Sequence, residues 1–336
     1  MQFMFLLKRF RFLSIFLATL LFLTISACNS DKLQPKQTQL NSSASCRKVK
    51  HIMGETCIPK NPQRIITLYT PPLANTLAFN IKPIGITPVT GVLDEFPKYL
   101  RDKVKGIEIV GNLNGEPNLE KIAQLKPDLI LGWDFHQKNY SLFSQISPTL
   151  LIPKDKTISS RYNWKEYTKF LAESLGEQER GQEIINRYNQ RIKELKKSLN
   201  NKYLGKTISV AHVSEKYGIE AHTKNSFSGS ILSDLGLQRP KSQDVIKPNG
   251  EIQAISQEKL ELIDGDVLFV LNFGKNDKKI LENLLKKPLW RNLKAVQKGQ
   301  VYPVDGWTWI VANPLAANAV LDDLFKYLVN PPQNNS

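Results

Sequence analysis

The chain has 336 residues, of which 41% are hydrophobic and 23% charged, and its formal net charge is +15. This length allows two domains of ordinary size, and a positive balance of this kind suits an anionic ligand or an anionic membrane surface. No basic stripe interleaved with aromatic residues occurs along the sequence, which argues against a nucleic-acid partner.

The amino terminus has the pattern of a secretory signal. Lys8, Arg9 and Arg11 precede an apolar run over 12–25, which is shorter than the ~20 residues of a membrane-spanning helix. The run ends in Ile-Ser-Ala-Cys, which resembles a bacterial lipobox and predicts that residues 1–28 form a lipoprotein signal with Cys28 lipidated. An uncleaved membrane anchor is the alternative. In both cases we expect the rest of the chain to be extracytoplasmic, as a periplasmic, membrane-anchored lipoprotein.

Residues 29–45 are rich in Asn, Ser, Gln and Lys, and we expect a flexible tether because such a stretch buries little apolar surface. Lipidation of Cys28 leaves Cys46 and Cys57 as an even pair. In an oxidising compartment these two are expected to form a disulfide, with two free thiols as the alternative. A hairpin turning at 53–54 would not place them directly opposite each other, so the bridge requires a longer loop or an offset.

From 46 to 160, short apolar and β-branched runs alternate with amphipathic stretches, and this alternation predicts an α/β lobe with a mainly parallel sheet. The expected strands are 64–69, 83–86, 107–110, 128–131 and 150–152, and a helix is expected over 119–125.

Residues 161–200 carry no strand signal and are rich in helix formers. Ile184, Tyr188, Ile192, Leu195 and Leu199 recur at spacings of three and four, which predicts one face of a long helix. The glycine at 176 separates it from a shorter helix over 164–175. A long helix is a stiff connection, so the flanking lobes are expected to open only slightly.

Strand texture resumes over 201–330, at 207–211, 267–271 and 300–304, and a final helix is expected over 314–328. The predicted fold is therefore α/β, with two α/β lobes joined by one long rigid helix and a ligand cleft between the lobes.

An enzyme is one possible functional class for this chain. The segment Ser226-Phe-Ser-Gly-Ser lacks the strand–turn–helix context of a nucleophile elbow and more simply begins a helix through Leu235. The sequence has neither a Walker-type phosphate loop nor a Cys–His pairing, so no catalytic residue is predicted. A structural or adhesive lipoprotein is a third possibility, but it would not need a cleft rich in Trp and Tyr.

Several phrases resemble the periplasmic-binding-protein family that serves siderophores, haem and cobalamin. They are Pro-Gln-Arg-Ile-Ile at 62–66, Pro-Asn-Leu-Glu-Lys-Ile at 117–122 with Leu-Lys-Pro-Asp-Leu-Ile at 125–130, Ile-Ser-Gln-Glu-Lys-Leu at 255–260, and the closing phrases at 288–290, 295–302 and 313–314. The similarity covers nearly all of the chain from 46 to 328. It implies ligand capture without turnover and delivery to an ABC permease with its ATPase.

The resemblance also implies two docking residues. Glu120 and Glu258 match the family's paired acidic residues, one per lobe, that insert into arginine pockets of the permease. The alternative is that each carboxylate stands in the first turn of a helix and interacts favourably with the helix dipole.

Aromatic and polar residues at strand ends suit a bulky ligand with apolar arms around a metal chelate. Trp133 and Trp307 match positions of the family's cleft contacts, whereas Trp290 is expected in the core. The predicted ligand-binding residues are Trp133, Arg161, Tyr162, Tyr217, Asn272, Trp307 and Trp309.

We therefore expect a monomeric protein that binds a ferric siderophore and needs no cofactor. Haem and cobalamin remain alternative ligands, because the sequence segments that resemble the family are common to its binding proteins for all three ligands. Direct zinc binding is a minority alternative that would require His136, His212 and His222 to converge. The siderophore is expected to saturate the iron, so no metal ligand from the protein is predicted.

Overall fold

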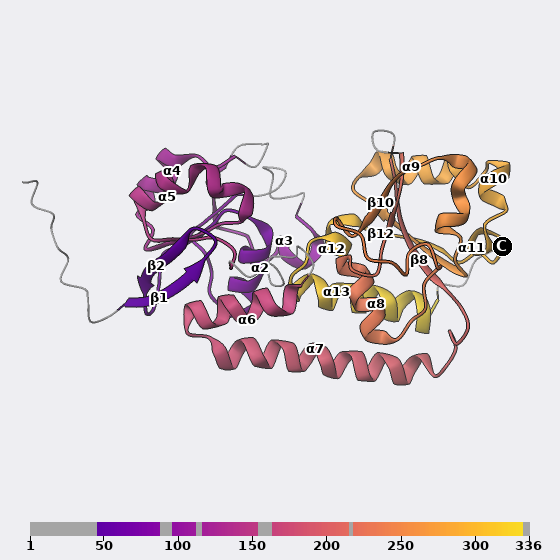
Figure 1. The fold of residues 1–336 in the computed structure, drawn as a ribbon, viewed down its shortest axis with the longest axis horizontal. Coiled ribbons are helices and arrows are strands. Elements are labelled where there is room, and N and C mark those ends of the chain that lie inside the picture. The colour runs from indigo at the N-terminus through magenta and orange to yellow at the C-terminus, as the bar shows by residue number, and fades with distance from the viewer. Residues whose placement is uncertain (1–45, 88–95, 112–115, 154–162, 215–217, 332–336) are drawn as a thin grey trace, which may run out of the picture. The chain divides into compact units, whose positions relative to one another are not determined.

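The computed structural model describes residues 46–87, 96–111, 116–153, 163–214 and 218–331. Figure 1 draws the fold of the chain as a ribbon. The expected signal segment, the lipidation site Cys28 and the tether lie outside the described residues, as do Arg161, Tyr162 and Tyr217. None of the helices within the described ranges is long and apolar enough to cross a membrane.

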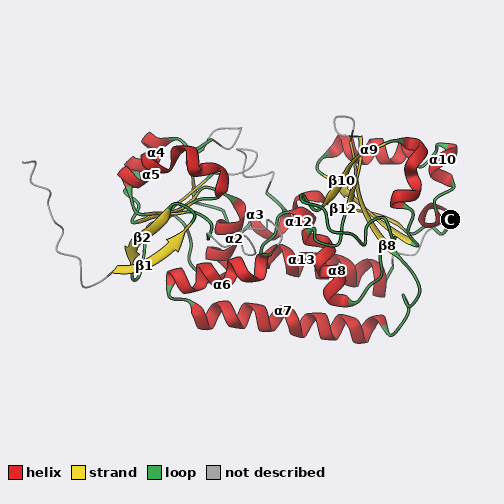
Figure 2. Cartoon of the chain, viewed as in Figure 1, coloured by secondary structure: helices red, strands yellow, loops and turns green. Residues whose placement is uncertain are grey.

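The first lobe is built on a five-stranded sheet in the order β5-β4-β3-β6-β7, in which every neighbouring pair is parallel. The strands are short, and β3, β4, β6 and β7 are fully buried because helices flank the sheet, whereas the edge strand β5 is not (Figure 2). The strands are β3 (Ile65–Thr67), β4 (Gly85–Ile86), β5 (Glu108–Ile109), β6 (Leu129–Leu131) and β7 (Thr149–Leu150). The helices are α2 (Thr70–Ala78), α3 (Lys98–Arg101), α4 (Leu119–Gln124), the 3₁₀ helix η2 (Asp134–Asn139) and α5 (Tyr140–Ile146).

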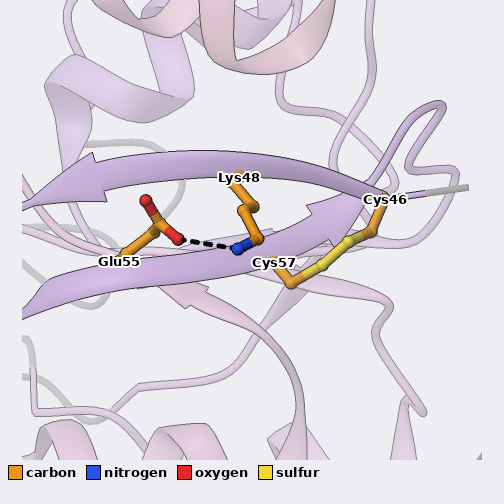
Figure 3. The surroundings of a disulfide bond; sticks show 4 residues. All are labelled: Cys46, Lys48, Glu55 and Cys57. Atoms are coloured by element: carbon orange, nitrogen blue, oxygen red, sulfur yellow. Dashed lines mark ion pairs between the residues drawn. A yellow bond between two sulfur atoms is a disulfide. The ribbon is translucent and has the colours of Figure 1, made fainter. Parts of the chain in front are cut away.

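A disulfide-bonded hairpin precedes this sheet. Strands β1 (Cys46–His51) and β2 (Gly54–Pro59) pair antiparallel, and Cys57 lies opposite Lys48 rather than opposite Cys46. The bridge between Cys46 and Cys57 therefore joins offset positions across a Cα–Cα distance of 5.6 Å, as predicted (Figure 3). Lys48 and Glu55 form an exposed ion pair beside it, with 3.4 Å between Nζ and Oε1.

Replacing Cys46 and Cys57 together by serine is expected to lower the free energy of unfolding by about 2–3 kcal/mol, because the bridge closes a loop between residues 11 apart and restricts the unfolded chain. Urea unfolding of the parent protein and of the double variant measures the difference. As a control, the parent protein with reductant should match the variant. Equal midpoints for the oxidised parent and the variant would contradict the prediction.

Two consecutive helices follow the first lobe. Helix α6 (Trp164–Leu175) ends at Gly176, whose φ of +82° is a left-handed conformation that favours glycine. Helix α7 (Gln178–Leu199) has 22 residues and buries Tyr188, Ile192, Leu195 and Leu199, four of the five positions predicted from spacing. It contacts α6 as well as α8 and α13 of the second lobe.

The second lobe has a mixed sheet in the order β10-β9-β8-β11-β12. Its strands are β8 (Ile208–Ser214), β9 (Gly218–His222), β10 (Glu251–Ile255), β11 (Val267–Asn272) and β12 (Val301–Asp305). The helices are α8 (Phe227–Leu235), the 3₁₀ helix η3 (Gln257–Ile263), α9 (Lys275–Leu284), α10 (Pro288–Arg291), α11 (Lys294–Gln297), α12 (Gly306–Ile310), α13 (Pro314–Leu324) and a closing π turn η4 (Phe325–Val329).

The α/β prediction is confirmed, and the one strand arrangement it missed is at the edge of the second sheet. Strands β8, β11 and β12 are parallel, but β9 pairs antiparallel with β8, and β10 pairs antiparallel with β9. A search for apolar runs does not find these strands, because they carry polar residues at 251 and 253 and a glutamate at 220. This antiparallel edge proves important, because it carries side chains of the candidate site.

Helix α13 connects the second lobe to helices of the first. It lies against α2 and α3, and Asn313, which caps its amino end, donates from Nδ2 to Oη of Tyr99 on α3 over 3.1 Å. Tyr99 is half-buried, and desolvation of its hydroxyl raises its pKa well above the ordinary value. The two lobes thus share a partly buried polar contact in addition to the two linking helices.

Candidate functional site

The candidate site lies where the parallel strands of the second sheet end. Strands β8, β11 and β12 run in the same direction, so the residues at their carboxyl ends gather at one edge, the usual ligand site of open α/β sheets. A pocket of about 600 Å³ opens there. Its polar lining comes mainly from His212, Glu220, His222, Glu251 and Asp277, and its apolar lining from Phe273, Trp307 and Ile310.

His212 is the centre of the polar wall. It is 7% exposed, its Nδ1 lies 3.2 Å from Oε2 of Glu220, and its Nε2 lies 3.7 Å from Oδ2 of Asp277. Register explains the first contact, because His212 on β8 lies directly opposite Glu220 on β9. Within the described residues, Nε2 is buried without a hydrogen-bond partner. Asp277 in turn accepts the backbone N–H of Phe273 over 2.9 Å.

His222 closes the other end of this wall. It is 4% exposed, and its Nδ1 lies 4.0 Å from Oε1 of Glu251 on the neighbouring strand β10. Burial, followed by the positive charge of Arg239 and the proximity of His212, lowers the pKa of His222 to about 3. The imidazole of His222 is therefore neutral at physiological pH.

Arg239 lies buried behind His222 and outside the pocket lining. Its Nη2 donates to the backbone oxygen of His222 and, over 2.8 Å, to Oε1 of Gln243. Burial lowers the pKa of Arg239 to about 10, so it keeps its positive charge at neutral pH. This charge is one reason why His222 stays neutral.

The apolar wall consists of two aromatic rings set edge to face. Phe273 follows β11 and Trp307 follows β12, and their ring centroids are 5.0 Å apart at an interplanar angle of 84°. A Cβ at Gly306 would come within 2.6 Å of the Phe273 ring, so only glycine allows this approach. Asp305 caps α12 by accepting the backbone N–H of Thr308 over 2.7 Å, which fixes the turn that presents Trp307.

Of the predicted ligand-binding residues that the structure describes, only Trp307 is found in the lining of this pocket. Asn272 is half-buried, and its Oδ1 accepts the backbone N–H of Gly274 over 2.9 Å, so the side chain stabilises the turn after β11. Trp133 is 6% exposed and packs in the core of the first lobe, edge to face with Tyr167. Its burial leaves little surface for a ligand.

Trp309, also predicted as a ligand contact, lies away from this pocket. It is 0% exposed, lies in the main core of the second lobe and stacks near Phe269, with ring centroids 4.7 Å apart. Its Nε1 donates to Oδ2 of Asp323 over 2.8 Å. Residues two apart on a helix point to opposite sides, so α12 directs Trp307 to the pocket and Trp309 to the core. Trp290, predicted as core, is also 0% exposed.

The carboxylates of the pocket were missed from the sequence. Glu220, Glu251 and Asp277 come from the two antiparallel strands β9 and β10 and from helix α9, and no motif joins them. The one available signal is the alternation of Glu220 and His222, which places both side chains on the same face of β9.

The three histidines weighed as metal ligands do not converge. His136 belongs to the first lobe, where its Nδ1 accepts the backbone N–H of Trp133 over 2.9 Å and burial lowers its pKa to about 4. Across the described part of the chain, no group of three or more His, Cys, Asp or Glu side chains is placed to hold a metal ion.

Glu120 and Glu258 are both exposed and both stand at the beginning of a helix. Glu120 lies in the first turn of α4, which Asn118 caps, and Glu258 in the first turn of η3. Hydrogen bonds from the backbone N–H of Glu258 and from the side chain of Ser256 lower the pKa of Glu258. Exposure leaves both carboxylates accessible to a partner.

The fold and the pocket together define a two-lobed binding protein. The periplasmic binding protein family matches residues 90–306. The chain is 34% identical over 333 residues to the probable siderophore-binding lipoprotein YfiY of Bacillus subtilis, covering 96% of this chain and 98% of that protein. It is 33% identical to the Fe(3+)-citrate-binding protein YfmC of the same organism, over 85% and 87% of the two chains.

A solved structure extends this similarity to the fold. Staphylococcus aureus SirA complexed with staphyloferrin B superposes with a TM-score of 0.71 at 28% identity, covering 83% of this chain and 97% of that one. The chain belongs to the periplasmic binding protein family.

Proposed function

We propose that this protein is the solute-binding component of an ABC importer, which captures a ferric siderophore outside the cytoplasm and delivers it to a membrane permease with its ATPase. The observation that carries the proposal is the similarity over almost the whole chain to a probable siderophore-binding lipoprotein. The likeness to a structure complexed with staphyloferrin B, and a pocket with aromatic walls at the strand ends, support it.

The pocket suits binding without turnover. Phe273 and Trp307 offer apolar faces for the arms of a chelate, while the polar wall around His212 offers hydrogen bonds. The siderophore itself saturates the iron, so the protein acts on the outer surface of the complex. Arg161, Tyr162 and Tyr217 stay candidates for this contact.

Delivery requires a place at the membrane and a way to meet the permease. We infer that Cys28 carries the lipid anchor of a monomeric lipoprotein, as the lipobox-like ending of the apolar run indicates. Glu120 and Glu258, exposed at the beginnings of α4 and η3, are the proposed docking residues, one in each lobe.

Haem is the second candidate ligand that a specific observation favours. His212 lines the pocket and its buried Nε2 has no hydrogen-bond partner within the described residues. An imidazole nitrogen of this kind is a common axial ligand of haem iron.

The test is a titration of the purified protein with ferric hydroxamate, catecholate and citrate-type chelates, haem, cobalamin and zinc, followed by tryptophan fluorescence and by calorimetry. Four of the five tryptophans, at positions 133, 164, 290 and 309, are at most 6% exposed. Trp307 is therefore the tryptophan placed to report occupancy of the pocket. We expect saturable quenching by one ferric chelate at sub-micromolar concentration, and a response to haem, cobalamin or zinc alone would contradict the siderophore assignment.

A further inference from the structure

The charge of the pocket has the opposite sign to the charge of the chain. The formal net charge is +15, yet the described lining contains the three carboxylates Glu220, Glu251 and Asp277 and no lysine or arginine. The positive net charge of the chain attracts anions in general, whereas the described lining of this pocket is acidic. Such a pocket repels a carboxylate arm and attracts a positively charged one.

His222 adds no positive charge to this lining. Its burial, followed by the nearby positive charge of Arg239, lowers its pKa to about 3 and keeps it neutral at physiological pH. Arg239 itself lies behind His222, where its Nη2 is engaged by the backbone oxygen of His222 and by Gln243.

His212 supplies an independent sign that this wall is built to bind a ligand. Its Nδ1 donates to Oε2 of Glu220 over 3.2 Å, because a carboxylate can only accept. Its buried Nε2 has no hydrogen-bond partner within the described residues and lies 3.7 Å from Oδ2 of Asp277. The carboxylates of Glu220 and Asp277 are thus the acceptors beside His212 at the pocket wall.

The aromatic wall favours the same kind of group. Phe273 and Trp307 present ring surfaces beside these acceptors, and His212 and Phe273 are in edge contact with ring centroids 4.7 Å apart. Aromatic faces attract cations, and tryptophan does so most strongly. Carboxylates together with aromatic rings form the usual environment of a bound alkylammonium group.

We propose that this pocket of the second lobe binds a positively charged, N–H-donating arm of the ferric chelate, an alkylammonium group, between the rings of Phe273 and Trp307 and the carboxylate of Asp277. The inference rests on the proposed siderophore function and deepens it. It selects chelates that carry a free amine at the end of an arm over those that end in a carboxylate or an amide.

The experiment compares matched pairs of ferric chelates by calorimetry. Each pair consists of a chelate with a primary amine on an alkyl arm and the same chelate with that amine acetylated, built on a trihydroxamate, a triscatecholate and a citrate-type core. Whichever core binds, the amine member is expected to bind about tenfold more tightly. Equal affinity within the binding pair would overturn the inference and leave the proposed function intact, whereas no binding by any core would overturn both.

Two variants on helix α9 test whether the ammonium group binds beside Asp277. Asp277→Asn keeps an oxygen that can accept the N–H of Phe273 but removes the charge, and it should abolish the tenfold preference for the amine member of the binding pair. Glu282→Gln, an exposed position on the same helix α9 and outside the pocket, is the matched control and should keep the preference. A preference that survives in Asp277→Asn would place the ammonium group elsewhere and overturn the assignment.

Discussion

Replacing Glu120 and Glu258 together by alanine should abolish uptake of the ligand and leave its binding unchanged. Both carboxylates are exposed at the beginnings of their helices, and neither lines the pocket. If each pairs with an arginine of the permease, losing one should weaken docking at least tenfold and losing both about a hundredfold. Uptake of a radioiron-labelled chelate by cells that carry only the variant measures transport, and calorimetry measures binding.

A matched control separates docking from general effects of charge. Glu173 on α6 and Glu282 on α9 are also exposed glutamates, one before and one after α7, but neither stands in the first turn of its helix. The Glu173→Ala, Glu282→Ala double variant should transport normally. Loss of chelate binding in the Glu120, Glu258 variant, or normal uptake by it, would remove these residues from the docking surface.

Trp307→Ala should weaken ligand binding and Trp309→Ala should lower stability, although the two residues are only two positions apart. Trp307→Ala removes an aromatic wall of the pocket and should weaken ligand binding about ten- to a hundredfold with little change in the free energy of unfolding. Trp309→Ala should lower the free energy of unfolding by about 3–5 kcal/mol, because the ring is 0% exposed in the core. It also deprives the half-hidden carboxylate of Asp323, whose pKa burial raises, of its donor.

Calorimetry with the chelate identified by titration and urea unfolding measure the two effects. Trp309→Phe keeps an aromatic ring in the core and should remain folded and bind normally, so it tests the assignment even if the alanine variant does not fold. Unchanged affinity in Trp307→Ala would take this residue out of the site. Lost affinity in a stably folded Trp309→Phe would restore Trp309 as a ligand contact.

Much of the fold was predictable because its elements depend on local periodicity. The long helix follows from apolar residues at spacings of three and four, and Tyr188, Ile192, Leu195 and Leu199 are indeed buried along it. The parallel strands follow from short β-branched runs. Strands β9 and β10 were missed, because strands that bear polar side chains toward a pocket lack the apolar pattern of a buried strand.

The kind of candidate site could be predicted from the sequence, but only some of its residues could. Aromatic residues at strand ends led to Trp307, and family phrases led to Glu120 and Glu258. The structure places Trp309 in the core rather than in this pocket, as the rule that separates residues two apart on a helix indicates. Glu220, Glu251 and Asp277 could not be grouped, because they are brought together by the pairing of β8, β9 and β10 and by the position of α9.

The amino-acid sequence by itself determined the α/β class, the long helix, the cysteine pair and the family, because each depends on residue types at short, regular spacings. Only the tertiary structure decided which tryptophan faces the pocket and that a strongly basic chain has an acidic binding pocket. Net charge is a sum over all residues, whereas the potential in a pocket depends on the few charges within several ångströms of it. Folding chooses those few, and here it collects three carboxylates in the lining of one pocket.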